Sequence, residues 1–155
     1  MENQPLKIHK LLRGSKKTLA VAESCTGGLL SSYFTQFPGS SKYFLLGAVT
    51  YSNRSKEDVL RIPRSLILKN GAVSEIVALT MARNVRKLAK ADLGIGITGI
   101  AGPSGGSKSK SVGTVFIAID SENQQIYGKF HFSGPRTTIQ KKAALKALEL
   151  LKRLL

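Results

Sequence analysis

The segment Thr18–Gln36, with the sequence TLAVAESCTGGLLSSYFTQ, joins a strand to a helix through a short polar turn. Its first part, TLAVA at Thr18–Ala22, is apolar and contains β-branched side chains, which predicts a buried strand. ESCTGG at Glu23–Gly28 turns the chain, and a helix is predicted over Gly28–Gln36, ended by Pro38-Gly39. A strand that runs directly into a helix is typical of α/β proteins.

The sequence on either side of this segment continues the alternation of helices and strands. The other predicted helices are Leu6–Arg13, Asn53–Leu60, Pro63–Lys69, one that begins after Ser74, and Thr137–Leu155. The other predicted strands are Tyr43–Tyr51, Leu93–Thr98, Val112–Asp120 and Gln125–Phe132, the last two as an antiparallel hairpin. We therefore predict an α/β fold, a three-layer α/β/α sandwich with a mixed, mostly parallel sheet containing one antiparallel hairpin. Residues 1–155 are predicted to form a single domain, with an N-terminal helix or leader at 1–14.

Two of the predicted helices have one apolar face. Ser74 is predicted to be the N-cap of the first, whose buried face carries Val77, Met81, Val85 and Leu88. The buried face of the C-terminal helix carries Ile139, Ala143, Ala147, Leu150 and Leu154. Both helices are expected to pack on the sheet.

Charge and composition describe a basic globular domain. The 155 residues include 24 Lys and Arg against 9 Asp and Glu, for a net charge of +15, and 42% of them are hydrophobic, which excludes a disordered chain. Aromatic residues are only 6% and tryptophan is absent, so a base-stacking surface for nucleic acid is not indicated. One cysteine excludes an internal disulfide, and no apolar run is long enough for a signal peptide or a membrane span. A soluble cytoplasmic protein, without a membrane or a specific nucleic-acid partner, is expected.

Three loops of unusual composition each follow a predicted strand: Glu23–Gly28, Tyr51–Lys56 (YSNRSK) and Thr98–Ser107 (TGIAGPSGGS). The ends of neighbouring parallel strands lie at one edge of a sheet, so we expect the loops to meet there. Two of them are rich in glycine and small hydroxyl residues, which lets backbone N–H groups approach a phosphate or an oxyanion. The pattern therefore predicts a ligand site at this edge.

Ser24 lies at a strand-to-helix junction, a position that suits either a nucleophile or an N-cap. Thr26 is an alternative cap, and Cys25 is an alternative nucleophile that is stronger if its thiol is deprotonated. The two histidines, His9 and His131, lie in segments that suggest no catalytic triad. The position alone leaves the cap and the nucleophile open.

Lys56 is the candidate base by its location in the second loop. A lysine can replace histidine when desolvation lowers its pKa, although a solvated surface charge is the alternative interpretation in so basic a chain. No cluster of His, Asp and Glu has metal-ligand spacing, and the glycine-rich loop matches neither a P-loop nor a dinucleotide fingerprint. Neither a metal nor a cofactor is expected.

Six segments in one order, spread over nearly the whole chain, resemble the CinA C-terminal domain family, the nicotinamide-nucleotide amidases. They are AESCTGG (22–28), VTYSNRSK (49–56), GAVSE (71–75), TGIAGPSGG (98–106), VGTV (112–115) and FSGPR (132–136). The resemblance implies a Ser-Lys hydrolase with Ser24 as nucleophile, Lys56 as base and Tyr51 as a hydroxyl that assists proton transfer. The implied reaction is deamidation of nicotinamide mononucleotide (NMN) to nicotinic acid mononucleotide and ammonia, a step of pyridine nucleotide salvage.

The residues expected to bind this substrate lie in the three loops and near the C-terminal helix. They are Thr26, Gly27, Gly28, Asn53, Thr98, Gly99, Ala101, Gly102 and Arg136. The glycine-rich segments are candidates for the oxyanion donors, and Arg136 for an anchor of the phosphate.

Three positions depart from the usual pattern of the family: Ser104 and Pro135 where aspartates are usual, and Gln140 where an arginine is frequent. The two lost carboxyl groups raise the local positive charge. Two other functions stay open, an inactive homologue that binds a nucleotide and a basic accessory protein of nucleic acid. A homodimer is expected from the open edge of the predicted hairpin and from the resemblance.

Overall fold

The computed structural model describes residues 3–155. Its helices are α1 (Gln4–Ser15), α2 (Leu29–Thr35), α3 (Asn53–Leu60), α4 (Arg64–Asn70), α5 (Glu75–Ala89) and α6 (Arg136–Leu151). Its strands are β1 (Leu19–Glu23), β2 (Phe44–Val49), β3 (Leu93–Gly99), β4 (Thr114–Ser121) and β5 (Gln125–His131). Short 3₁₀ turns lie at Ser40–Lys42 and Lys152–Leu154. Every helix and strand expected from the sequence is present, with ends that differ by a few residues.

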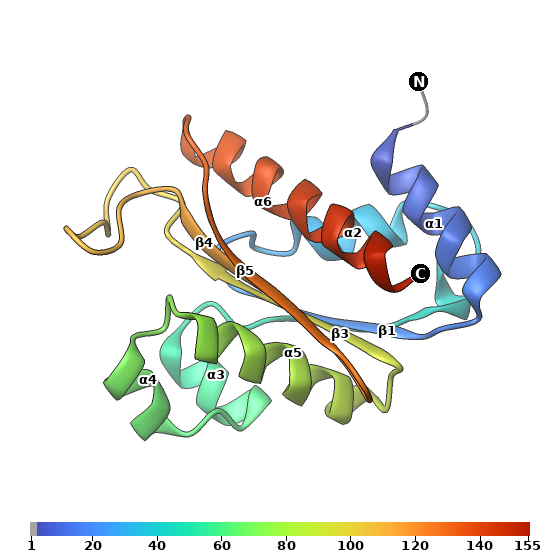
Figure 1. The fold of residues 1–155 in the computed structure, drawn as a ribbon, viewed down its shortest axis with the longest axis horizontal. Helices are drawn as coiled ribbons and strands as arrows, with labels where there is room; N and C mark the ends of the chain where they lie inside the picture. Colours follow the sequence, from blue (N-terminus) through green and yellow to red (C-terminus); the bar gives the residue numbers. More distant parts are fainter. Residues whose placement is uncertain (1–2) are drawn as a thin grey trace.

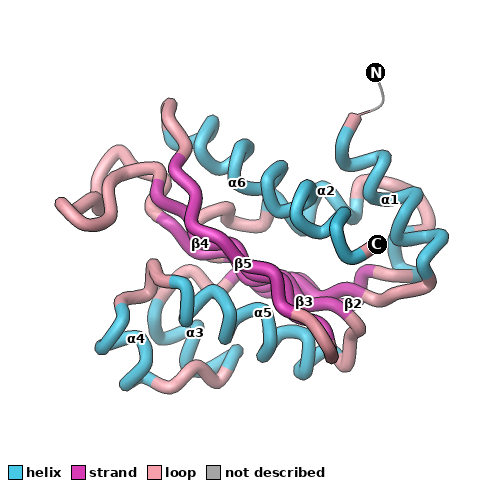
Figure 2. Tube along the Cα trace, in the orientation of Figure 1, coloured by secondary structure: helices cyan, strands magenta, loops and turns pink. Residues whose placement is uncertain are grey.

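The five strands form one sheet in the order β2-β1-β3-β4-β5. β1 pairs in parallel with both β2 and β3, and β4 pairs antiparallel with β3 and β5. Figures 1 and 2 show the sheet between two layers of helices, with α1, α2 and α6 on one side and α3, α4 and α5 on the other. The predicted α/β/α sandwich, including its antiparallel hairpin, is confirmed. The parallel pairing places the ends of β1, β2 and β3 at one edge of the sheet.

The small residues of β3 reflect how closely α5 packs against it. A Cβ added at Gly94 or Gly96 would collide with carbonyl oxygens of Ala82 and Ala78 on α5. Glycine at these positions therefore brings the helix backbone onto the strand, while Ile95 and Ile97 point into the core on the other face. The alternation of glycine and isoleucine in LGIGIT (93–98) therefore reflects the close packing of α5 on one face of β3 and of the core on the other.

The predicted face of α5 is correct at Val77, Met81 and Val85, which are buried, and wrong at Leu88, which is 55% exposed. The buried row continues by steps of four to Ala89, which packs against the core, so that Leu88 lies beside the row. The prediction for the C-terminal helix is correct at Ile139, Ala143, Ala147 and Leu150, which are buried on α6. Leu154 lies beyond α6 in the 3₁₀ turn and is only partly buried.

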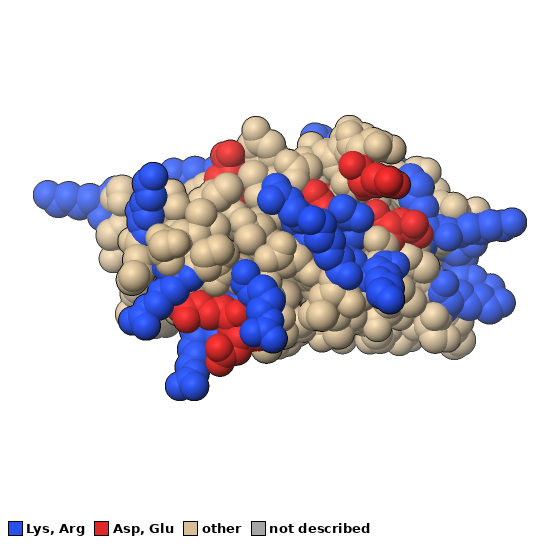
Figure 3. Space-filling model, turned by 90° about the horizontal axis from the view of Figure 1, so that it is seen from below, with Lys and Arg blue, Asp and Glu red and all other residues tan. Residues whose placement is uncertain are grey.

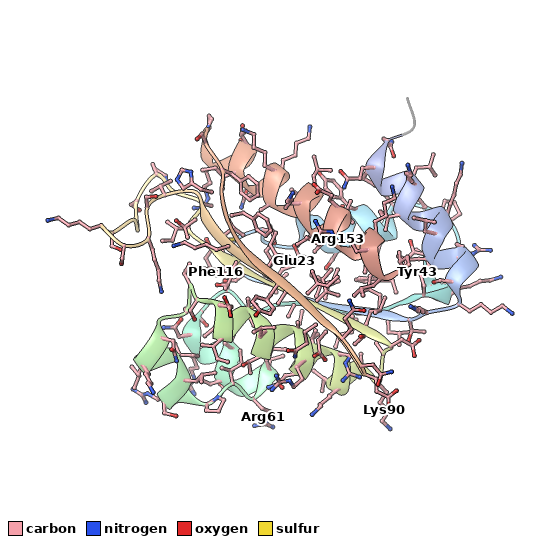
Figure 4. All side chains as sticks on the ribbon, viewed as in Figure 1. Glu23, Tyr43, Arg61, Lys90, Phe116 and Arg153 are labelled. Atoms are coloured by element: carbon pink, nitrogen blue, oxygen red, sulfur yellow. The ribbon has the colours of Figure 1, made fainter. Side chains whose placement is uncertain are left out.

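Lys and Arg side chains are spread over the face formed by α3, α4 and α5, with Asp and Glu among them (Figure 3). Arg61 and Lys90 extend away from this layer (Figure 4). Arg86 forms an ion pair of 2.6 Å with the buried Asp120. The face therefore presents dispersed charge rather than a single basic track.

Over residues 3–155, no helix is long and apolar enough to cross a membrane.

Candidate active site

A cleft of about 260 Å³ lies where β1, β2 and β3 end. Its walls come from the three loops of unusual composition, from the loop before α5 and from the start of α6. The expected site residues that line it are Ser24, Tyr51, Asn53, Lys56, Thr98, Gly99, Ala101, Gly102 and Arg136. The expectation that the three loops meet is thus confirmed.

Ser24 and Lys56 are in direct contact at the bottom of this cleft. Lys56 Nζ lies 2.9 Å from Ser24 Oγ, and the same nitrogen donates to the carbonyl oxygen of Thr50 at 2.7 Å and to that of Tyr51 at 3.4 Å. Lys56 is 1% exposed and Ser24 is 8% exposed. Lys56 is therefore not a solvated surface charge, although it belongs to a very basic chain.

Burial lowers the pKa of Lys56 from its ordinary value of 10.5 to about 8, because the charged ammonium loses its hydration. A neutral amine has two N–H groups and one lone pair. The carbonyl groups of Thr50 and Tyr51 can accept the two N–H bonds, which leaves the lone pair for the hydroxyl proton of Ser24. The arrangement suits proton transfer from Ser24 to Lys56.

The neighbouring thiol is poorly suited to nucleophilic attack. Cys25 is buried, and burial raises the pKa of its thiol to about 12, so that the thiolate is scarce at neutral pH. Ser24, by contrast, bonds to a lysine with a lowered pKa. The geometry favours the serine.

Glu23, which the sequence analysis did not identify, caps α2. One carboxylate oxygen accepts from Thr26 Oγ1 at 2.6 Å and from Leu30 N at 2.9 Å, and the other accepts from Ser31 N at 2.9 Å and Ser31 Oγ at 2.7 Å. Glu23 is fully buried in the layer between the sheet and the upper helices (Figure 4). A carboxylate at the N-terminus of a helix is favourable because it satisfies free N–H groups and the helix dipole. The one signal in the sequence is a charged residue at the end of an apolar strand.

Because Glu23 accepts these N–H groups, Ser24 does not cap α2. Gly28 occupies the N-cap position of α2 without a side-chain bond, and Thr26 gives its hydroxyl to Glu23. The alternative interpretation of Ser24 or Thr26 as the helix cap is therefore wrong. Thr26, Gly27 and Gly28 do not line the cleft, so their expected contact with substrate stays a prediction.

Several backbone N–H groups beside the cleft lack partners. Among residues 3–155, the N–H group of Thr26 in the first loop has no hydrogen bond, nor do those of Ala101 and Gly102 in the third. Gly102 has φ +77°, where an L side chain would be strained, and a Cβ there would collide with Val112. Both loops can thus offer N–H donors to an anion.

Arg136 spans the mouth of the cleft from the first residue of α6. Its Nη1 donates to the carbonyl oxygen of Gly102 at 2.6 Å, and its Nη2 donates to the hydroxyl of Tyr51 at 2.5 Å. Tyr51 is 58% exposed, and its hydroxyl bonds to Arg136 rather than to Ser24 or Lys56. Its role in proton transfer stays a prediction.

The remaining expected residues have clear positions. Thr98 donates its hydroxyl to the carbonyl oxygen of Ala72 at 3.0 Å, which ties β3 to the loop before α5, and Asn53 is exposed at the start of α3. Ala72, Val73 and Ile100 also line the cleft, although they were not predicted as site residues. They are ordinary apolar residues that carry no chemical signal.

The charge of the cleft is positive. Lys56 and Arg136 are among its lining residues, and within residues 3–155 no Asp or Glu lines it. Ser104, one of the three departures from the usual family pattern, also lines the cleft. Within residues 3–155, no group of three or more His, Cys, Asp and Glu side chains could hold a metal ion. An anionic ligand suits this cleft better than a cationic one.

Comparison with known proteins gives one consistent result. The family model of the CinA C-terminal domain matches residues 2–155. The chain is 48% identical over 146 residues to a CinA-like protein of Geobacter metallireducens, covering 94% of this chain and 35% of that one. It is 49% identical over 148 residues to a putative competence-damage inducible protein of Caldanaerobacter subterraneus subsp. tengcongensis, covering 96% and 36%. The chain thus spans about a third of the length of these relatives.

Solved structures agree with the sequence comparison. A competence-damaged protein (CinA) superfamily protein from Escherichia coli matches with a TM-score of 0.94 and 34% identity, over 99% of this chain and 90% of that one. The competence/damage inducible protein CihA from Agrobacterium tumefaciens matches with a TM-score of 0.93 and 32% identity, over 99% and 97%.

Proposed function

The chain belongs to the CinA C-terminal domain family, and from its site we propose that it is an amidohydrolase that converts NMN to nicotinic acid mononucleotide and ammonia. The observation that carries the proposal is the contact of 2.9 Å between Ser24 Oγ and the buried Lys56 Nζ. A serine bonded to a lysine that is partly neutral near pH 8 is an activated nucleophile, and acyl transfer is the chemistry that such a pair performs.

In the proposed mechanism Ser24 Oγ attacks the carboxamide carbon while its proton passes to Lys56. The tetrahedral oxyanion accepts hydrogen bonds from unpaired backbone N–H groups of the first or third loop. Lys56 then returns the proton to the amide nitrogen, the C–N bond breaks and ammonia leaves, so that an ester to Ser24 remains. Water attacks this ester with Lys56 again as base, which releases the carboxylate and restores the Ser24 hydroxyl.

The phosphate of a mononucleotide fits the charge of the cleft. Arg136 uses two of its N–H groups for Gly102 and Tyr51, and a guanidinium has five, so it keeps donors for a phosphate oxygen. No acidic side chain of the described residues lines the cleft, so none of them repels a substrate with negative charge there. These features support a nucleotide substrate over free nicotinamide.

The proposal is tested by ammonia release from NMN with the purified protein, beside nicotinamide riboside and nicotinamide. Wild-type protein is expected to release ammonia from NMN, and Ser24→Ala is expected to lower kcat by about 10⁴-fold or more, because no other nucleophile is activated. The variant is expected to keep its melting temperature, since only one buried hydroxyl is lost. Cys25→Ala is the matched control and should keep kcat within about threefold.

A folded wild-type protein that releases no ammonia from NMN would contradict the proposed substrate. In that case the departures at Ser104, Pro135 and Gln140 become the first positions at which to look for a changed specificity, or for a nucleotide-binding protein without turnover.

Arg136 is expected to recognise the phosphate of the substrate rather than its carboxamide. Arg136→Ala is expected to raise KM for NMN by about 10-fold to 100-fold and to leave kcat/KM for nicotinamide riboside nearly unchanged, because a charge-assisted bond to phosphate contributes about 1.5–3 kcal/mol. Steady-state kinetics with both substrates measure this difference. Arg54→Ala, an exposed arginine on α3 paired with Asp58, is the control and should change neither constant. Equal losses on both substrates would show that Arg136 acts through Tyr51 or Gly102 instead of through the phosphate.

A further inference from the structure

The turn that carries Ser24 is held by backbone hydrogen bonds to β3, to the start of α2 and within the turn itself. Ser24 N donates to the carbonyl oxygen of Ile97 on β3, and Gly27 N donates to the carbonyl oxygen of Ser24, each at 3.0 Å. The carbonyl oxygen of Thr26 accepts from Leu29 N at 3.1 Å. The carbonyl oxygens of Ser24 and Thr26 thus accept hydrogen bonds from nearby backbone N–H groups. The carbonyl oxygen between them, that of Cys25, has a side chain as its partner instead.

That carbonyl, of Cys25, accepts a hydrogen bond of 2.9 Å from Gln140 Nε2. Gln140 lies on α6 and is half-buried. Its helix is rigidly seated, because the neighbouring Ile139 and Ala143 are buried in the main core. A side chain on a well-packed helix thus bonds to the turn that carries Ser24. A helix holds such a turn in place more precisely than a loop would.

The bond from Gln140 determines the direction of a neighbouring donor. The carbonyl of Cys25 and the N–H of Thr26 belong to one planar trans peptide, so they point in opposite directions, and fixing one fixes the other. The N–H group of Thr26 is unpaired within the described part of the chain, 3–155. Donors that stabilise an oxyanion must be oriented before the reaction, since reorienting them during it costs free energy.

We propose that Gln140 is a positioning residue of the hydrolytic centre, whose side-chain amide holds the Cys25–Thr26 peptide so that the N–H of Thr26 is oriented toward the oxyanion. The inference rests on the proposed function, because it requires Ser24 to attack an electrophilic centre. Within residues 3–155 the Gln140 side chain has no hydrogen bond to Ser24 or Lys56, and its bond to the Cys25 carbonyl is the route by which it acts.

The test replaces Gln140 by methionine, which has a similar length and no N–H donor. Gln36→Met is the matched control, because Gln36 Nε2 also donates to a backbone carbonyl, that of Tyr33 at 3.1 Å, at the far end of α2. Two rates are measured on the full chain: NMN turnover, and labelling by a fluorophosphonate. In the labelling the Ser24 Oγ–phosphorus bond forms, the phosphorus–fluorine bond breaks, fluoride leaves and the proton of Ser24 passes to Lys56. Charge on the phosphoryl oxygen then needs the same N–H donors.

Gln140→Met is expected to lower both kcat for NMN and the labelling rate by about 10-fold or more, with KM within about threefold, because the donors act in the transition state rather than on bound substrate. Gln36→Met is expected to keep wild-type rates. The melting temperatures of both variants separate this effect from a loss of folded protein.

The labelling rate tests the role of Gln140, and NMN turnover tests the proposed substrate. A labelling rate of Gln140→Met within twofold of wild type overturns the inference, as does an equal loss in Gln36→Met. If wild-type protein is labelled at Ser24 and Gln140→Met is labelled slowly, but NMN is not hydrolysed, the inference holds and the proposed substrate fails. If wild-type protein is neither labelled nor active, both fail.

Discussion

Replacing Lys56 by methionine is expected to lower kcat for NMN at neutral pH by about 10³-fold or more, because the serine loses its base. Methionine is close to lysine in length and suits a buried position, so the fold should persist. Circular dichroism checks the fold, and ammonia release measures the activity. Lys87→Met, at an exposed lysine of α5, is the control and should retain full activity. A Lys56→Met protein with more than about a tenth of wild-type kcat would exclude Lys56 as the base.

The lowered pKa of Lys56 also predicts the pH dependence of wild-type activity. Only the neutral amine accepts the proton of Ser24, and with a pKa of about 8 it is a minority at pH 7. The value of kcat/KM should therefore rise about tenfold per pH unit below pH 8 and level off above it. A profile that is flat from pH 6.5 to 9.5 would contradict this assignment.

The lowered pKa of Lys56 also makes the stability of the protein depend on pH. The pKa of Lys56 is about 8 in the folded protein and 10.5 in an ordinary environment, so the unfolded chain binds more protons between these values. The free energy of unfolding should rise with pH through this window, by about 3 kcal/mol from this one group. Lys56→Met lacks the contribution, so the difference between the two proteins, measured by urea unfolding at pH 8 and pH 10.5, isolates it.

Replacing Glu23 by glutamine is expected to reduce the free energy of unfolding by about 3 kcal/mol or more, because an amide nitrogen would face hydrogen-bond donors. The buried carboxylate accepts four bonds, and a glutamine side chain of the same shape has only one acceptor oxygen. The N-terminus of α2 would lose its cap, and the adjacent Ser24 would lose its fixed position. Urea unfolding measures the first effect and ammonia release the second.

The matched control is Glu75→Gln, the same change at the exposed first turn of α5. Within residues 3–155 this carboxylate has no hydrogen bond or ion pair and lies at the favourable end of the helix dipole, so a loss of about 0.5 kcal/mol is expected. If Glu23→Gln costs no more than Glu75→Gln, the four hydrogen bonds do not stabilise the protein as described.

Local sequence determined the secondary structure and most of the site residues. Apolar runs with β-branched side chains mark the strands, and Pro38-Gly39 and Asn70-Gly71 mark helix ends, because these signals act over a few neighbouring residues. Glycine-rich segments after strands likewise indicated where a ligand could approach the backbone. The prediction placed Leu88 on the buried face of α5, where the structure has Ala89. The orientation of the helix on the sheet decides which of these two adjacent residues is buried, and local sequence does not determine that orientation.

Only the tertiary structure decided which side chains meet and what their surroundings do to them. Ser24 and Lys56 are separated by 32 residues, and they touch because β1 and β2 pair in parallel and end together. The pKa of Lys56 depends on its burial beneath the cleft, which no local pattern records. Arg136 reaches Tyr51 across 85 residues, and Gln140 reaches the turn of Ser24 across 115. A sequence determines local conformation by short-range sterics and hydrogen bonds, whereas contacts and desolvation are properties of the packed chain.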